Sequence, residues 1–254
     1  MHTDWLVPQW HAGEPVAAVM TTRAGGVSTG PFASMNLGRF VGDDPANVEA
    51  NIATLREAIG VEPVLLKQVH GTRVVCLDEG EVDETCSGAG IEADASYTTR
   101  AGRACVVTVA DCLPVLLAAP GGRGVAAAHA GWRGLAGGIV EKTLADLCEA
   151  AGCGAHEVVA WLGACIGASA FEVGADVLHA FGNARPERFV PRPAAAGQRW
   201  LADLPGLARD RLLAAGVSEI AGGNWCTVSD ASRFFSFRRD RITGRMAAAI
   251  WLRR

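Results

Sequence analysis

Two short apolar runs, each leading to a side chain that can bind a metal, constrain this chain more than any other feature. Val106–Val109 is followed shortly by Cys112, and Val125–Ala128 is followed directly by His129. Short apolar runs bounded by turn residues are typical of buried strands, and a rigid strand fixes the position of a group at its end. The stretch Cys105–Gly134 therefore predicts two strands that deliver a thiol and an imidazole to a cleft.

Composition excludes several classes of protein. Of the 254 residues 50% are hydrophobic, yet no apolar run approaches the roughly 18 residues that a membrane helix needs. The first residues lack a basic segment followed by an apolar core, so we expect no secretory signal and a cytoplasmic location. The net charge of -4 and the pI near 5.9 argue against a nucleic-acid partner. The eight cysteines are accordingly expected to be reduced thiols.

Strand and helix patterns alternate along the rest of the chain. Apolar runs predict strands over Val16–Thr22, Val64–Val69, Val74–Leu77, Asp94–Thr99, Ala104–Val109, Val115–Ala118, Val158–Leu162, Val217–Ala221 and Met246–Leu252. Helical spacing predicts helices that follow the cap residue Asp44 and end at Gly60, and helices over Leu135–Ala151, Ala175–Phe181 and Leu204–Ala215. No linker or internal repeat is evident, which predicts a single α/β domain over residues 1–254.

Three connections stand out between these elements. The segment Arg23–Gly38 is rich in glycine and proline, and loops of this length inside a compact domain are usually functional or disordered. The acidic segment Asp78–Glu92 predicts an exposed hairpin or loop. Arg185–Gln198 is expected to be an irregular connection.

His70 repeats the arrangement of a strand that closes on a histidine and then a glycine. Together with Cys112 and His129 it makes a donor set suited to zinc with three protein ligands and one open position, which is typical of catalytic sites. The sequence separations are long and match no compact zinc-finger pattern, so spacing alone leaves open a core thiol and ordinary buried histidines. The position of all three residues at the ends of apolar runs favours the metal site.

Several long motifs occur in a fixed order along nearly the whole chain. They are TTRAGGVSTGPFASMNLG with VGDDP, KQVHG, ADASYTT, VADCLPVLL, HAGWRG, WLGACIGASAFEVG and FFSFRRDRITGRMAAAIWL. In these motifs the chain resembles the YfiH-like laccase-domain family, also called the multicopper polyphenol oxidase or purine nucleoside phosphorylase family. Departures are few: Ala164 stands where proline is common, and Val228 and Phe237 stand where tyrosine is frequent.

The resemblance implies a fold, a metal site and an activity. The fold would be a layered α/β/β/α arrangement with mixed sheets, like the catalytic domain of cytotoxic necrotizing factor. The family's zinc ligands fall on His70, Cys112 and His129, which would also be the catalytic residues, and copper is the alternative metal. The implied activity is phosphorolysis of adenosine, inosine and methylthioadenosine, with deamination of adenosine, so purine nucleosides and phosphate are the expected partners.

Arginines in the matching motifs are candidates for binding phosphate, because a guanidinium forms paired hydrogen bonds to phosphate oxygens. They are Arg23, Arg133, Arg238 and Arg239. The alternative for each is a solvated or structural ion pair.

Other polar and aromatic residues have two interpretations each. Asp94 or Asp111 would orient a ligand histidine or contact the substrate, or else cap a turn. Asn36 would hydrogen-bond a sugar or base, or form a turn. Trp132 and Phe171 would stack on a purine, or belong to the core.

Three other functions remain open from the sequence. The first is a cysteine hydrolase, with Cys112 as nucleophile and His129 as its base, for example in editing of cell-wall precursors. The second is a copper polyphenol oxidase, which we rank lower because one His-His-Cys set is too small for a multicopper cluster. The third is a non-enzymatic module that holds a metal or binds a partner.

Overall fold

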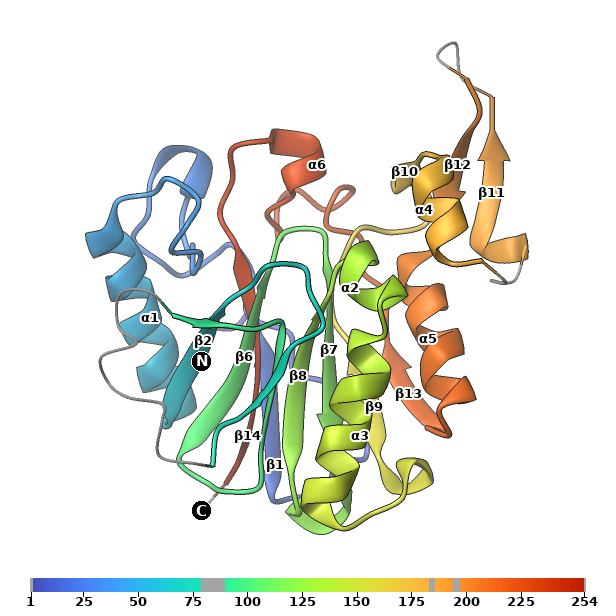
Figure 1. The fold of residues 1–254 in the computed structure, drawn as a ribbon. Coiled ribbons are helices and arrows are strands. Elements are labelled where there is room, and N and C mark those ends of the chain that lie inside the picture. The colour runs from blue at the N-terminus through green and yellow to red at the C-terminus, as the bar shows by residue number, and fades with distance from the viewer. Residues whose placement is uncertain (1, 79–89, 183–185, 194–196, 254) are drawn as a thin grey trace.

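The computed structural model describes residues 2–78, 90–182, 186–193 and 197–253. Two mixed sheets dominate it (Figure 1). The first sheet has the order β1-β14-β6-β2-β4, with strands β1 Val16–Met20, β14 Met246–Leu252, β6 Arg103–Val109, β2 Glu62–Lys67 and β4 Ile91–Glu92. The second has the order β13-β9-β7-β8-β5-β3, with strands β13 Glu219–Gly222, β9 Val159–Leu162, β7 Leu113–Ala118, β8 Val125–Ala130, β5 Ala95–Thr98 and β3 Val74–Cys76.

A small third sheet and six α-helices complete the arrangement of the described residues. The third sheet contains β10 Glu172–Val173, β12 Arg199–Ala202 and β11 Phe189–Arg192. The helices are α1 Pro45–Ile59, α2 Trp132–Ala136, α3 Ile139–Ala151, α4 Ala175–Ala180, α5 Leu204–Ala214 and α6 Phe237–Asp240. Figure 1 shows α1 beside the first sheet and α3 and α5 beside the second.

Alternation along the strands produces the layers. In β6, Cys105 and Val107 belong to the apolar cluster between the two sheets, whereas Ala104 and Val106 belong to the cluster under α1. Successive side chains of a strand point to opposite faces, so a strand covered on both sides is apolar throughout. A third cluster joins the second sheet to α3 and α5. The result is the α/β/β/α arrangement, which confirms the predicted fold class.

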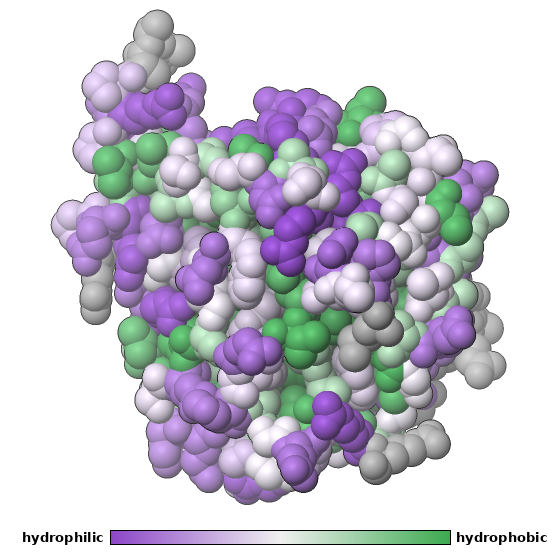
Figure 2. All heavy atoms as spheres, turned by 180° about the vertical axis from the view of Figure 1, so that it is seen from behind, coloured by the Kyte–Doolittle hydropathy of each residue, from purple (hydrophilic) through white to green (hydrophobic). Residues whose placement is uncertain are grey.

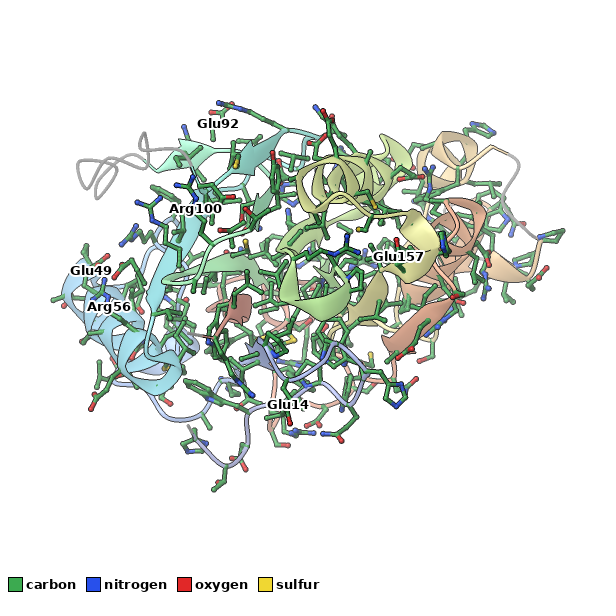
Figure 3. All side chains as sticks on the ribbon, turned by 90° about the horizontal axis from the view of Figure 1, so that it is seen from below. Glu14, Glu49, Arg56, Glu92, Arg100 and Glu157 are labelled. Atoms are coloured by element: carbon green, nitrogen blue, oxygen red, sulfur yellow. The ribbon has the colours of Figure 1, made fainter. Side chains whose placement is uncertain are left out.

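The surface is correspondingly polar. Figure 2 shows a face on which hydrophilic residues cover much of the surface and hydrophobic ones appear in patches. In Figure 3, Glu49 and Arg56 lie on the outer side of α1, where Arg56 pairs with Glu62 at 2.7 Å.

In the described part of the chain, no helix combines the length and apolar character needed to span a bilayer.

The first helix follows its predicted signals. Asp44 caps α1 by accepting a hydrogen bond from the N–H of Ala46 at 2.9 Å, Pro45 occupies the first turn, and Gly60 ends the helix in the left-handed region with φ 72°. These are the roles that Asp, Pro and Gly commonly take at helix ends.

Three sequence predictions need correction. The helix predicted over Leu135–Ala151 is two helices, α2 and α3, because Gly138 adopts φ 92°, which a helix does not allow. The connection predicted over Arg185–Gln198 contains β11, which pairs with β12. His129 lies inside β8 rather than after it.

The predicted acidic hairpin at Asp78–Glu92 lies mostly outside the described residues. Its two ends are described: Asp78 follows β3, and β4 pairs in parallel with β2 through Ile91 and Leu66.

Candidate active site

His70 lies in a turn beyond the end of β2 and is held there by one carboxylate. Its backbone is left-handed, with φ 60°. Asp94, which is fully buried, accepts hydrogen bonds from the N–H groups of Val69 at 3.3 Å, His70 at 2.9 Å and Gly71 at 2.7 Å. Three donors on a single carboxylate make this turn rigid and offset the cost of the unusual φ at His70.

Cys112 lies in a second constrained turn, between β6 and β7. The preceding residue, Asp111, has φ 92°. Its carboxylate accepts from Thr227 Oγ1 at 2.5 Å and from the N–H of Arg238 at 2.7 Å, and its carbonyl accepts from the N–H of Ile166 at 2.9 Å. The side chain of Asp111 therefore fixes the loop that presents the Cys112 thiol.

His129 is the buried member of the group, with 3% of its surface exposed. Its side chain is on the same face of β8 as those of Val125 and Ala127, which face the first sheet. Its Nδ1 lies 2.9 Å from Asp94 Oδ1, so that nitrogen carries a proton, and in the neutral ring Nε2 has the lone pair that can bind a metal. Asp94 thus orients His129 and shapes the turn of His70.

The three donor groups converge on one point. One ligand atom from each of His70, Cys112 and His129 lies within 4.8 Å of the others, and Cys112 Sγ is 3.8 Å from His70 Nε2. Tetrahedral zinc, with bonds of about 2.0–2.3 Å to nitrogen and sulfur, places its ligands roughly 3.5 Å apart. The residues therefore fit a metal ion of this size with small adjustment.

Gly131 leaves room for this convergence. A Cβ at position 131 would lie 2.9 Å from Cys112 Sγ and 3.0 Å from His70 Cδ2, which is closer than side chains normally approach. The glycine of the HAGW motif is therefore needed for space rather than for an unusual backbone conformation, since its φ is -62°.

The same contacts set the ionisation of the site. Burial opposes ionisation of the Cys112 thiol, but the charge and hydrogen bonds of His129 and His70 lower its pKa to about 6. Burial also disfavours a charged His129, yet the Cys112 thiolate and the hydrogen bond to Asp94 raise its pKa to about 9. Without a metal, the pair is therefore a thiolate beside an imidazolium at neutral pH.

The site opens into a cavity of about 510 Å³. Both sheets and the loop after residue 36 contribute to its walls. Aromatic side chains on the walls are Phe40, Trp132, Phe171 and Phe237, of which Phe40 and Phe237 are 65% and 48% exposed. A cavity of this size suits a small molecule, and aromatic rings suit a planar heterocycle.

Some predicted binding residues line this cavity. Arg133 does so with its guanidinium carbon 4.3 Å from the centre of the Trp132 ring. Arg238 does so while donating to the carbonyl of Glu172 at 2.8 Å. Asp111 also lines it.

Other predicted binding residues are used inside the fold. Arg23 donates to the carbonyls of Ala33 and Ala231 at 3.1 and 3.0 Å. Arg239 donates to the carbonyl of Thr227 at 2.7 Å and pairs with Asp240. These contacts match the structural alternative for both arginines, and their role in binding stays a prediction.

Asn36 is fully buried and braces the chain around it. Its Oδ1 accepts from the N–H groups of Gly38 and Arg245, both at 2.9 Å, and its Nδ2 donates to Asp43 at 2.9 Å. Asp94 lies behind the donor groups and does not line the cavity.

Arg245 lines the cavity and was missed in the sequence. It stands just before β14, and Met246 pairs with Val109 at the end of β6. The TGR segment before an apolar strand was the available signal, but only the strand pairing places Arg245 beside the loop of Cys112.

The chain matches known proteins over nearly its full length. The family model for multi-copper polyphenol oxidoreductase laccase matches residues 17–253. A purine nucleoside phosphorylase of Pseudomonas aeruginosa is 47% identical over 249 residues, covering 98% of each chain. The purine nucleoside phosphorylase YfiH of Escherichia coli is 45% identical over 254 residues, covering 97% of this chain and 98% of the relative.

Solved structures give the same result. YlmD from Geobacillus stearothermophilus is 33% identical with a TM-score of 0.90, covering 98% of this chain and 96% of that one. A Neisseria meningitidis protein is 42% identical with a TM-score of 0.87, covering 98% and 99%. The convergent His-Cys-His site, the layered fold and these matches over nearly the full length lead to one conclusion: the chain belongs to the YfiH-like family of multi-copper polyphenol oxidoreductase laccase proteins.

Proposed function

We propose that this protein is a zinc-dependent purine nucleoside phosphorylase that acts on adenosine, inosine and methylthioadenosine, with adenosine deaminase activity. The observation that carries the proposal is the convergence of His70, Cys112 and His129 at a cavity with aromatic and cationic walls. The names of the relatives support phosphorolysis as the main reaction.

The residues of the chain have separate tasks in this proposal. His70, Cys112 and His129 hold the zinc, which when bound supplies a Lewis acid to the reacting end of the cavity. Asp94 keeps the proton of His129 on Nδ1, so that the lone pair of Nε2 is available to the zinc. The aromatic walls hold the purine and exclude water from it, and Arg133 and Arg238 at the cavity wall neutralise the phosphate.

Phosphorolysis places fewer demands on these residues than deamination does. Asp111 is the one carboxylate among the described residues that line the cavity, and both of its oxygens already accept hydrogen bonds. Phosphate is itself a nucleophile at neutral pH, whereas a water that attacks the purine ring needs a group to take its proton. We therefore propose deamination as the slower activity.

The test is to incubate the purified protein with each nucleoside and phosphate and to separate the products by chromatography. Adenosine should yield adenine and ribose 1-phosphate, with a smaller amount of inosine. Cys112→Ala should abolish both products, whereas Cys148→Ala, which removes another half-buried thiol outside the cavity, should not. Absence of all products, or equal activity of Cys112→Ala, would contradict the proposal.

A cysteine hydrolase is the second candidate, because Cys112, His129 and Asp94 are arranged as nucleophile, base and orienting carboxylate. Metal removal separates the two functions. The metal-free protein should react with iodoacetamide at Cys112 with a midpoint near pH 6, and the zinc-loaded protein should be protected. Hydrolysis that persists after chelation would favour the hydrolase.

A further inference from the structure

The walls of the cavity carry an excess of positive charge. Its lining includes one carboxylate, Asp111, and five cationic side chains among the described residues: Arg39, Lys67, Arg133, Arg238 and Arg245. A concave wall of one sign attracts a ligand of the other. At least one of the ligands that bind in this cavity should therefore carry negative charge.

Two of these cations are already neutralised. Arg39 forms a paired interaction with Glu49, at 2.8 and 3.2 Å. Lys67 lies 3.4 Å from the carboxylate of Glu92. Neither has much to gain from an added anion.

Arg245 differs from them because its charge is half-buried and has no acidic partner in the described part of the chain. Its Nη1 donates to the carbonyls of Thr243 and Gly244 at 3.0 and 3.1 Å, which leaves its other donors unused by these bonds. Burial lowers the pKa of Arg245, while the negative charges of Cys112 and Asp111 act in the opposite direction. A half-buried guanidinium that forms no ion pair with the described residues can gain more from an added anion than Arg39 or Lys67 can, which points to an anion from outside the chain.

The stem of Arg245 is held in a prepared position. Gly38 packs so closely on it that a Cβ at position 38 would lie 2.7 Å from Arg245 Cγ. Asn36 Oδ1 accepts hydrogen bonds from the N–H groups of both Gly38 and Arg245 at 2.9 Å. The N–H of Leu37 donates to the carbonyl of Arg245 at 3.0 Å. An arginine fixed at its backbone and stem loses less entropy on binding than a free surface arginine. Asn36 is therefore a positioning residue for Arg245.

We propose that Arg245 is the anchor for the phosphate co-substrate and holds it at the Cys112 end of the cavity. This proposal rests on the proposed phosphorylase function. The planar guanidinium presents paired N–H donors that match two oxygens of a phosphate. Strand pairing places Arg245 beside the loop of Cys112, so an anion held there lies next to the metal-binding group.

The experiment measures binding of inorganic phosphate to the metal-loaded protein by titration calorimetry, without a nucleoside. Arg245→Gln should weaken phosphate binding by about 10- to 100-fold, as expected for loss of a charge-assisted hydrogen-bond pair. Arg39→Gln is the matched control, because Arg39 lines the same cavity but is occupied by Glu49, and should leave the phosphate affinity within about twofold. In phosphorolysis, Arg245→Gln should raise KM for phosphate far more than KM for the nucleoside.

The outcomes separate this proposal from the proposed function. If wild-type protein does not bind phosphate, or Arg245→Gln binds it as tightly, the Arg245 site is wrong. If phosphate binding depends on Arg245 but no nucleoside is cleaved, the anion site stands and the phosphorylase function fails. If Arg245→Gln does not fold, Arg245→Lys decides: it keeps the charge but loses the paired donors, so unchanged phosphate affinity would overturn the proposal.

Discussion

Replacing Asp94 with asparagine should disconnect the turn of His70 from the ring of His129. The carboxylate accepts four hydrogen bonds, with Oδ1 serving His70 N–H and His129 Nδ1 and Oδ2 serving Val69 and Gly71. An amide nitrogen at either oxygen position faces two donors and cannot accept from them. Asp94→Asn therefore loses two of its four acceptor contacts whichever way the amide turns.

The loss has two measurable consequences. Each hydrogen bond to a charged acceptor is worth about 1.5–3 kcal/mol, so the substitution should lower the free energy of unfolding by about 3 kcal/mol. For a chain of this size that corresponds to a fall in Tm of about 6–12 °C. Because outer partners of ligand histidines hold them in place, metal affinity should also fall by about 10- to 100-fold.

Competition with a chromophoric chelator measures the metal affinity, and calorimetry measures the Tm. Asp78→Asn is the matched control: Asp78 accepts from the N–H and Oγ1 of Thr99, at 3.0 and 2.6 Å, and from Thr98 Oγ1, but lies outside the cavity. It should lower stability without changing metal affinity. If Asp94→Asn retained wild-type metal affinity, Asp94 would not orient the candidate ligands His70 and His129.

Substitutions at Gly131 and Asp78 test the packing around the donor groups and the charge of a second hydrogen-bonded carboxylate. Gly131→Ala should lower the free energy of unfolding by about 1–3 kcal/mol and weaken metal binding, because the new methyl group would press on Cys112 and His70. Urea denaturation measures the stability and metal titration measures the affinity. Unchanged metal affinity would show that position 131 tolerates a side chain beside these two residues. The pKa of Asp78 is lowered because, although burial raises it, the hydrogen bonds from Thr98 and Thr99 outweigh that effect. Its contribution to stability should therefore be present above the unfolded-state pKa of about 3.9 and be lost as the pH falls through the lower folded value. Urea denaturation at several pH values should show Asp78→Asn about 2 kcal/mol less stable than wild type at pH 7 and nearly equal to it at strongly acidic pH, and a difference that grew on acidification would reverse the sign we assign.

The sequence predicted most of the elements for local reasons, and it placed the candidate ligands His70, Cys112 and His129 near the ends of apolar runs. Asp44, Pro45 and Gly60 mark the ends of α1 through contacts within a few residues of themselves. The apolar run of β6 is continuous because both of its faces are covered, one by the second sheet and the other by α1. Breaks within an element were harder to predict. Gly138 divides the predicted helix Leu135–Ala151 into two helices, although the apolar spacing continues across it.

The residues that line the cavity were harder to predict than the three groups that converge at its end. Arg23, Arg133 and Arg239 look equivalent as arginines in shared motifs, but Arg133 lines the cavity while Arg23 and Arg239 donate to backbone carbonyls. Asn36 had two interpretations, a substrate contact or a turn former, and the sequence did not indicate that it also accepts a hydrogen bond from Arg245, 209 positions away in the chain. Hydrogen-bond partners at such separations depend on how the sheets are paired, which a local pattern does not record.

By itself the sequence indicated approximately where the buried strands end and which motifs they carry, because burial and capping act within a few residues. Only the tertiary structure decided which side chains come together at the ends of those strands. Strand register and the packing of two sheets bring one carboxylate, Asp94, to both histidines and set Arg245 beside Cys112. These are contacts between segments far apart in the chain, and their geometry is fixed only when the layers close on one another.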